Sequence, residues 1–125
     1  MFRGYMNTKT FGAWGEQLAV EFLGRLNYRV QERNFSVRFA EIDIIARLPN
    51  QTLSFIEVKT RSHGEMSAER ATSMCKRKKI AHAAKMYCLQ NAIDLNYTTC
   101  IFEHISVYVD VTHKRVRLKK YFLPL

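Results

Sequence analysis

The sequence predicts an α/β fold in which a mixed central β-sheet is flanked by α-helices. Segments with helical periodicity interleave with short runs of β type, in the order helix, strand, hairpin, helix, hairpin. The chain has 125 residues, the length of one domain, and 47% of them are hydrophobic, so we expect a single domain spanning 1–125 with its own core. Helices and strands interleaved within one domain favour a sheet covered by helices.

Two helices are predicted, over residues 12–26 and 68–91. In the first, large apolar side chains recur at every fourth position: Trp14, Leu18, Phe22 and Leu26. In the second, the apolar stripe consists of Ile80, Ala84, Tyr87 and Cys88. One apolar stripe on each helix is typical of a helix that packs against a sheet along one face.

Five strands are predicted, and four of them pair as hairpins. The runs of β type cover residues 28–34, 40–47, 52–60, 100–109 and 114–122. Turn-forming residues separate the second run from the third, at 48–51, and the fourth from the fifth, at 110–113. The pairing within each hairpin is therefore antiparallel.

The net charge of +9 is concentrated in two blocks that lack acidic residues. The basic residues that we expect to contact the phosphates of a nucleic acid are Lys76, Arg77, Lys78, Lys79 and Lys85 in the first block and Arg115, Arg117 and Lys119 in the second. Such contacts set the orientation of DNA but carry no sequence code. The alternative is a basic face that is merely solvated.

The remaining composition points to the cytoplasm. No run of 18 apolar residues is present to span a membrane, and residues 1–11 lack the apolar core of a signal peptide. Three cysteines form neither an even disulfide set nor a closely spaced pair of metal ligands, which fits a reducing compartment. We therefore expect a cytoplasmic protein without a membrane partner.

The residues that suggest chemistry lie on the second and third strands. Side chains alternate along a strand, so Glu57 and Lys59 share a face with the apolar Leu53 and Phe55. If these strands form a hairpin centred near residues 49–50, Asp43 stands opposite residue 56 or residue 57, and the second register puts its carboxylate beside that of Glu57. Two opposed carboxylates repel unless a cation lies between them.

This arrangement predicts a divalent-metal site for phosphodiester hydrolysis. Mg²⁺, or Mn²⁺ in its place, favours one or two carboxylates with water and substrate phosphate, which suits Asp43 and Glu57. Lys59 would position the attacking water or offset the charge that develops on the phosphate. Glu16, on the inner half of the first helix, is a further candidate ligand, direct or through water. The alternatives are a surface Glu-x-Lys ion pair and, for Glu16, an acid that complements the helix N-terminus.

These residues also resemble a known family. Gly15-Glu16, Arg33-Asn34, Glu41-Ile42-Asp43 and Glu57-Val58-Lys59-Thr60-Arg61 look like the motifs of the YraN-like family of predicted endonucleases, over about Gly12 to Tyr108. More distantly, the chain is similar to archaeal Holliday-junction resolvases and to the restriction-endonuclease-like superfamily. The resemblance implies a restriction-endonuclease-like fold, metal ligation by Asp43 and Glu57, a catalytic role for Lys59, and Glu16 as the helix acid.

The resemblance has further implications and two departures. It implies that Arg61 contacts phosphate, and a resolvase-like role would also imply a homodimer. Ala40 replaces the glycine usual before Glu-Ile-Asp, and Ile101-Phe102-Glu103 replaces an Arg-Phe-Asp pattern. We therefore expect a metal-dependent DNA endonuclease selective for branched or damaged DNA. The alternatives are a non-catalytic nucleic-acid-binding module and a domain whose basic face binds an acidic protein.

Overall fold

The computed structural model describes residues 7–62 and 74–124, and within these ranges it confirms the predicted order of helices and strands. The elements are α1 (Thr8–Arg25), β1 (Arg29–Val37), β2 (Ala40–Arg47), β3 (Leu53–Ser62), α2 (Met74–Gln90), β4 (Cys100–Asp110) and β5 (Arg115–Phe122). The part of the second predicted helix at 68–73 lies outside the described residues.

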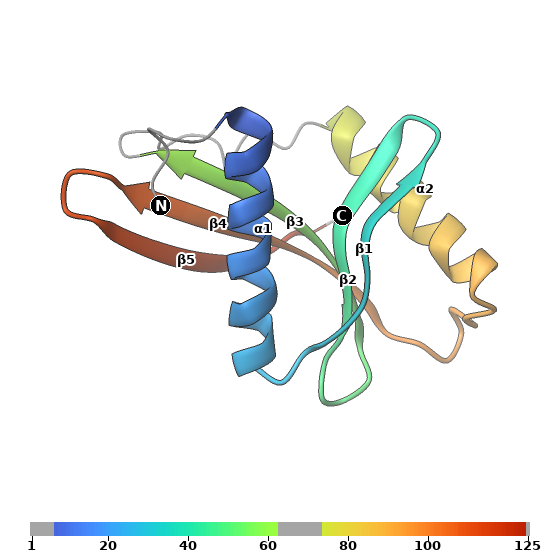
Figure 1. Cartoon of the computed structure of the whole chain (residues 1–125). Coiled ribbons are helices and arrows are strands. Elements are labelled where there is room, and N and C mark those ends of the chain that lie inside the picture. The colour runs from blue at the N-terminus through green and yellow to red at the C-terminus, as the bar shows by residue number, and fades with distance from the viewer. Residues whose placement is uncertain (1–6, 63–73, 125) are drawn as a thin grey trace.

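The strands of the described residues form one mixed sheet in the order β1-β2-β3-β4-β5 (Figure 1). β1 pairs with β2, β2 with β3, and β4 with β5 in antiparallel fashion. β3 and β4 instead run parallel, with Glu57 beside His104. A parallel pair needs a crossover connection, and α2 lies within the one that joins β3 to β4. The predicted α/β class with a mixed sheet flanked by helices is thus confirmed.

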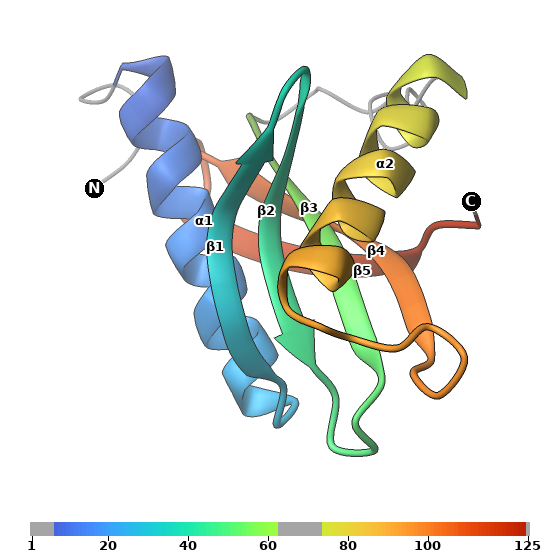
Figure 2. The same ribbon diagram turned by 90° about the vertical axis from the view of Figure 1, so that its right-hand side faces the viewer.

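The two helices cover opposite faces of the sheet, as Figure 2 shows with α1 on one side and α2 on the other. Against α1 lies an apolar cluster that includes Leu23, Ile44 and Ile56, all fully buried. Against α2 lies a second cluster that includes Phe55 and Tyr87. The alternation of β3 explains the division, because Phe55 and Ile56 are consecutive residues and therefore point to opposite faces.

The packing of α1 differs from the predicted stripe. The buried positions are Phe11, Gly15, Ala19 and Leu23, one residue away from the expected line, and Leu26 is the 42% exposed C-cap. Small residues in this line allow close approach: a Cβ at Gly15 would lie 1.8 Å from Thr60 Oγ1 on β3. Only glycine at this position lets α1 lie so close to the sheet, and it brings the neighbouring Glu16 toward β2 and β3.

Both ends of α1 are capped, and the described helices also bear on the membrane prediction. Asn7 caps α1 by accepting a hydrogen bond from Thr10 N, and Asn27, at φ 64°, ends it in the left-handed conformation typical of a helix C′ residue. Within the described residues, no helix is both long and apolar enough to cross a bilayer.

Candidate metal and nucleic-acid site

The site begins where β2 and β3 separate. Ile44 pairs with Ile56, and Ile45 with Phe55, which is the second of the two registers considered for the hairpin. One further step would place Asp43 opposite Glu57. At that point the carboxylate of Asp43 accepts a hydrogen bond from Val58 N at 2.8 Å, and so replaces the carbonyl oxygen that a continued ladder would supply. The carboxylate of Asp43 is therefore fixed in the gap between the strands.

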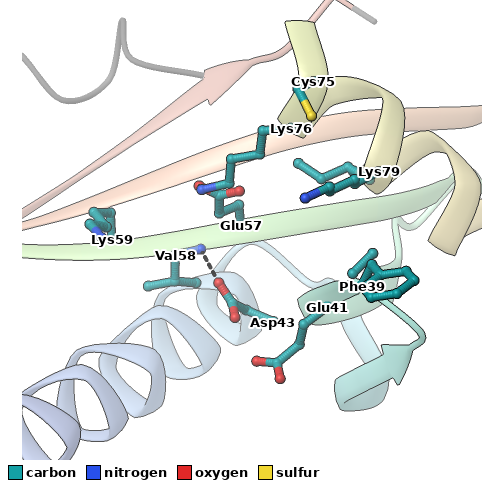
Figure 3. A pocket seen from close by; sticks show the side chains of 11 residues that line it. Phe39, Glu41, Asp43, Glu57, Val58, Lys59, Cys75, Lys76 and Lys79 are labelled. Carbon is teal, nitrogen blue, oxygen red and sulfur yellow. Dashed lines mark hydrogen bonds and ion pairs between the residues drawn. The ribbon is translucent and has the colours of Figure 1, made fainter. Parts of the chain in front are cut away.

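Asp43, Glu57 and Lys59 line one cavity of about 550 Å³ (Figure 3). The β1–β2 turn and β2 contribute Phe39, Ala40 and Glu41 to its lining, β3 contributes Val58, and α2 contributes Cys75, Lys76, Lys79 and Ile80. The structure thus brings the three residues predicted to do chemistry into a common space beneath the first turns of α2. Three carboxylates and three ammonium groups line one volume large enough for a phosphate and water.

Glu57 has two basic neighbours. Lys76 donates a hydrogen bond from Nζ to Glu57 Oε1 at 2.7 Å, and the Glu57 side chain is only 16% exposed. His104 Nδ1 lies 3.9 Å from the same carboxylate oxygen, and His104 Nε2 lies 3.1 Å from Ser106 Oγ. The buried His104 reaches Glu57 because β4 runs parallel to β3 in the register that places the two residues side by side.

Asp43 lies in a negative and partly desolvated environment. Its pKa is raised from 3.8 to about 6, mainly by burial; the hydrogen bond from Val58 N lowers the pKa, and the charges of Glu16, Glu57 and Glu41 add to the increase. Desolvation and like charges both favour the protonated carboxyl group. Both effects therefore oppose the ionisation of Asp43.

The Glu16 side chain is 13% exposed, and its ion-pair partner is Arg33 on β1. Arg33 Nη2 lies 3.4 Å from Glu16 Oε1, and Arg33 Nη1 donates to Gln17 Oε1 at 2.9 Å. Among the described residues, no three His, Cys, Asp or Glu side chains gather closely enough to hold a metal ion by themselves. Glu16 contributes through its field on Asp43, and its role as a ligand stays a prediction.

The basic residues predicted to contact phosphate fall into three groups. Lys76 and Lys79 line the cavity, whereas Lys78 and Lys85 are exposed on α2 outside its lining and Arg77 is half-buried. Arg115, Arg117 and Lys119 are exposed on β5. Arg117 lies 5.1 Å from the ring centroid of Tyr108, and Lys119 lies at the same distance from that of Tyr121.

Arg61 is buried, whereas the predicted contact with phosphate implies an exposed side chain. Its side chain is 3% exposed, and Nε has no hydrogen-bond partner among the described residues. Alternation along β3 puts Arg61 on the face of Glu57 and Lys59, but packing covers it there. In this conformation Arg61 is a buried structural residue, and a direct phosphate contact would require it to become exposed.

Sequence reasoning missed Phe39, Glu41 and His104. Phe39 and Glu41 line the cavity because they flank the start of β2, and the Glu-Ile-Asp motif that contains Glu41 was a signal for that position. His104 is not among the predicted site residues, and only the parallel β3–β4 register places it beside Glu57. No local pattern carries that register, since it depends on how α2 returns the chain.

The departure at Glu103 has a structural explanation. Glu103 is 3% exposed on the α1 face and accepts hydrogen bonds from Tyr28 Oη at 2.8 Å, Ser54 Oγ at 2.7 Å and Lys120 Nζ at 2.6 Å. For Lys120, burial lowers the pKa, but the hydrogen bond to Glu103 and the charge of Glu103 outweigh it and leave the pKa raised. Burial and the bond to Glu103 also raise the pKa of Tyr28.

A five-stranded mixed sheet with a helix on each face is compatible with the restriction-endonuclease-like class, and the Asp43–Glu57–Lys59 cavity lies where β2 and β3 of that sheet part. The chain belongs to the family described as uncharacterised protein family UPF0102, also called YraN, whose model matches residues 15–112. The resemblance predicted from the motifs is thereby confirmed.

Relatives at moderate identity cover most of the chain. A UPF0102 protein of Clostridioides difficile (strain 630) is 37% identical over 105 residues, which cover 83% of this chain and 90% of the relative. One of Alkaliphilus oremlandii (strain OhILAs) is 41% identical over 100 residues, covering 79% and 85%. One of Caldicellulosiruptor saccharolyticus is 34% identical over 111 residues, covering 87% and 91%.

Proposed function

We propose that this protein is a divalent-metal-dependent endonuclease that hydrolyses phosphodiester bonds in DNA, with Asp43, Glu57 and Lys59 at the reaction centre. The observation that carries the proposal is that two carboxylates and a lysine from two strands line one cavity of about 550 Å³. Burial and, after it, the charges of neighbouring carboxylates raise the pKa of Asp43, so the fold holds a carboxylate where its charged form is disfavoured without a cation. Metal-assisted hydrolysis of a phosphodiester uses carboxylates to hold the cation and a positive group to offset charge on the phosphate.

The donor set fits Mg²⁺ or Mn²⁺. Asp43 and Glu57 supply hard carboxylate oxygens, and the cavity leaves room for water and a phosphate oxygen, which are the usual companions of Mg²⁺ in proteins. The pKa of Asp43 is raised by burial and by the charges of neighbouring carboxylates, and a bound cation would favour the ionised carboxylate against both effects. When bound there, the cation would act as a Lewis acid and lower the pKa of a coordinated water.

The protein's own groups have separable tasks in this proposal. Lys59 is exposed into the cavity, where its ammonium group can hydrogen-bond the attacking water or offset charge on the phosphate. Lys76 and Lys79 line the cavity from α2 and can bind the DNA backbone. Lys76 would then exchange Glu57 for a phosphate oxygen, which leaves the Glu57 carboxylate available.

The experiment that tests the proposal is cleavage of labelled branched, nicked, duplex and single-stranded DNA by wild type and by Glu57→Ala. Each reaction contains Mg²⁺, Mn²⁺ or EDTA. The proposal expects cleavage by the wild type alone, abolished by EDTA, and a ranking of substrates by shape. Cleavage that survives Glu57→Ala would remove the site assignment. If branched DNA is cut on both strands, the oligomeric state measured at the same concentration tests for a homodimer.

One observation favours a second candidate, a nucleic-acid-binding module without catalysis. The Lys76 ammonium group already neutralises Glu57 at 2.7 Å, so a protein cation takes the place proposed for a metal. DNA binding that persists in EDTA, with no cleavage under any metal, would select this candidate.

A further inference from the structure

We propose that the tip of the β1–β2 hairpin, Arg38 and Phe39, stacks on a nucleobase next to the bound phosphate and so selects DNA with an unpaired base at the cavity. This inference rests on the proposed function and deepens it, because it assigns the substrate class to a particular side chain. The observations that carry it are the exposure, the backbone conformation and the position of Phe39.

Phe39 exposes an unusual amount of apolar surface at the cavity. The residue is 76% exposed and lines the cavity that holds Asp43 and Glu57. Figure 3 shows its ring on one side of the cavity while Lys76 and Lys79 project from α2. A phenylalanine side chain left in water forfeits a burial free energy of about 2 kcal/mol, so packing within this chain does not account for the residue.

Turn geometry does not account for Phe39 either. Val37 pairs with Ala40, so Arg38 and Phe39 form the whole loop of the hairpin. Phe39 has φ 69°, in the left-handed region where glycine or asparagine is the usual occupant and a bulky side chain is strained. An aromatic residue held there against its own preference, beside a reactive centre, is the kind of strain that accompanies function.

Arg38 contacts the Phe39 ring and leaves part of the ring open to a base. Its guanidinium carbon lies 5.0 Å from the centroid of the Phe39 ring, a cation–π contact that helps to orient the ring. Because three quarters of Phe39 is exposed, the ring keeps area for a second stacking partner. The same guanidinium adds positive charge at the point where a nucleic-acid strand would pass.

The chemistry of the cavity walls sets the orientation of that strand. The lysines of α2 attract phosphate, and Phe39, contributed by the β1–β2 turn, offers a ring face to a base. A base inside an intact duplex has both faces covered by its neighbours and presents only its edges. Stacking on Phe39 therefore requires a base that is unpaired or easily displaced, as in a loop, a gap or a branch point.

The test compares a fully paired duplex with the same duplex carrying a short unpaired loop, by fluorescence anisotropy in Ca²⁺ to measure binding without relying on cleavage. Phe39→Gly suits the left-handed backbone and removes the ring. It should weaken binding to the looped DNA by roughly 5- to 100-fold, and binding to the paired duplex by less than about 2-fold. Phe39→Trp should retain the preference. Phe122→Ala, which removes a 64% exposed phenylalanine outside the cavity lining, is the matched control and should change neither affinity.

A 5-iodouracil placed in the loop provides a second measurement, since the proposal expects photo-crosslinking to Phe39. Equal effects of Phe39→Gly on both DNAs, or none on either, would overturn the proposal. Wild type that prefers looped DNA through Phe39 but cuts no DNA would reject the nuclease and keep the stacking. Wild type that cuts both DNAs equally, unaffected by Phe39→Gly, would reject the stacking and keep the nuclease. Wild type that binds neither DNA would reject both.

Discussion

The sheet holds carboxylates in two contrasting environments. On the α1 face, Glu103 is nearly inaccessible, and both of its oxygens accept hydrogen bonds, one of them from the ammonium group of Lys120. At the α2 side, Asp43 and Glu57 line an open cavity, and Asp43 has a pKa raised to about 6 by burial and by neighbouring carboxylates. Both environments pair a carboxylate with a lysine, but only Glu103 accepts hydrogen bonds at both of its oxygens from buried or partly buried donors.

The difference separates a structural charge from a reactive one. A buried carboxylate that stabilises a fold is surrounded by enough donors and by a counter-charge, as Glu103 is. A carboxylate that binds a ligand has oxygens able to accept further contacts, lies near other negative charges and is accessible to solvent. Substitutions around Glu103 should therefore change mainly the free energy of unfolding. Substitutions around Asp43 and Glu57 should change mainly metal binding and cleavage.

The largest effect on stability is expected for Lys120→Met. It leaves Glu103 buried at 3% exposure without its counter-charge, and we expect a loss of about 2–4 kcal/mol in the free energy of unfolding. Urea denaturation measures this loss. Lys76→Met, which breaks the pair of Glu57 with a lysine that is 49% exposed, should cost less than about 1 kcal/mol. Equal losses in the two variants would contradict the distinction.

A smaller effect of opposite sign is expected for Asp43→Asn. Folded Asp43 keeps its proton to about pH 6, whereas the ordinary value is 3.8, so the protonated group contributes stability that is complete below pH 3.8 and lost as the pH rises through about 6. Above that pH the charged carboxylate opposes folding. Asparagine stays neutral and can still accept from Val58 N, so the variant should be more stable than wild type at pH 8 by roughly 2–3 kcal/mol.

The measurement for Asp43→Asn is urea denaturation at pH 4, 6 and 8 in EDTA, and the gain should vanish toward pH 4. Glu21→Gln, an exposed acid on α1, serves as the control and should follow wild type at each pH. A destabilised Asp43→Asn at pH 8 would mean that the carboxylate is held for stability, which would place it with Glu103.

The smallest effect on stability is expected for Lys59→Met. Lys59 is exposed, so the free energy of unfolding should change by less than about 0.5 kcal/mol. On the proposed function, cleavage should fall by at least about 10²-fold, because charge on the phosphate loses its partner. Lys9→Met, at an exposed lysine on α1 outside the cavity lining, is the matched control for removing one positive charge. Similar cleavage by both variants would remove Lys59 from the reaction.

Much of the structure around Asp43 and Glu57 could be predicted from the sequence, because it depends on residues that are close together in the chain. The hairpin centre near residues 49–50 and the period of two along a strand reduced the pairing to two registers, and the structure has the second of them. The apolar stripe predicted for α2 is likewise confirmed, because its four residues are all buried: Ile80, Ala84, Tyr87 and Cys88. The motifs around Asp43 and Glu57 also carried part of the family resemblance, which the match over residues 15–112 confirms.

What escaped the sequence depends on contacts between distant elements. The proximity of His104 to Glu57 requires the parallel pairing of β3 with β4, which a periodicity within one strand does not encode. Burial of Arg61 and the saturation of Glu103 depend on which side chains meet on each face. The buried line of α1 shifted by one residue because Gly15 and Ala19 permit a closer approach to the sheet than Trp14 and Leu18 would allow.

The most direct test of this contrast is a Mn²⁺ titration followed by electron paramagnetic resonance, on wild type, Glu57→Gln and Glu103→Gln. Thermal unfolding of each variant confirms that it is folded at the temperature used. We predict that wild type and Glu103→Gln bind Mn²⁺ alike, while Glu57→Gln loses at least about tenfold in affinity. Equal affinity in wild type and Glu57→Gln, or no Mn²⁺ binding by wild type, would contradict a metal site at Asp43 and Glu57.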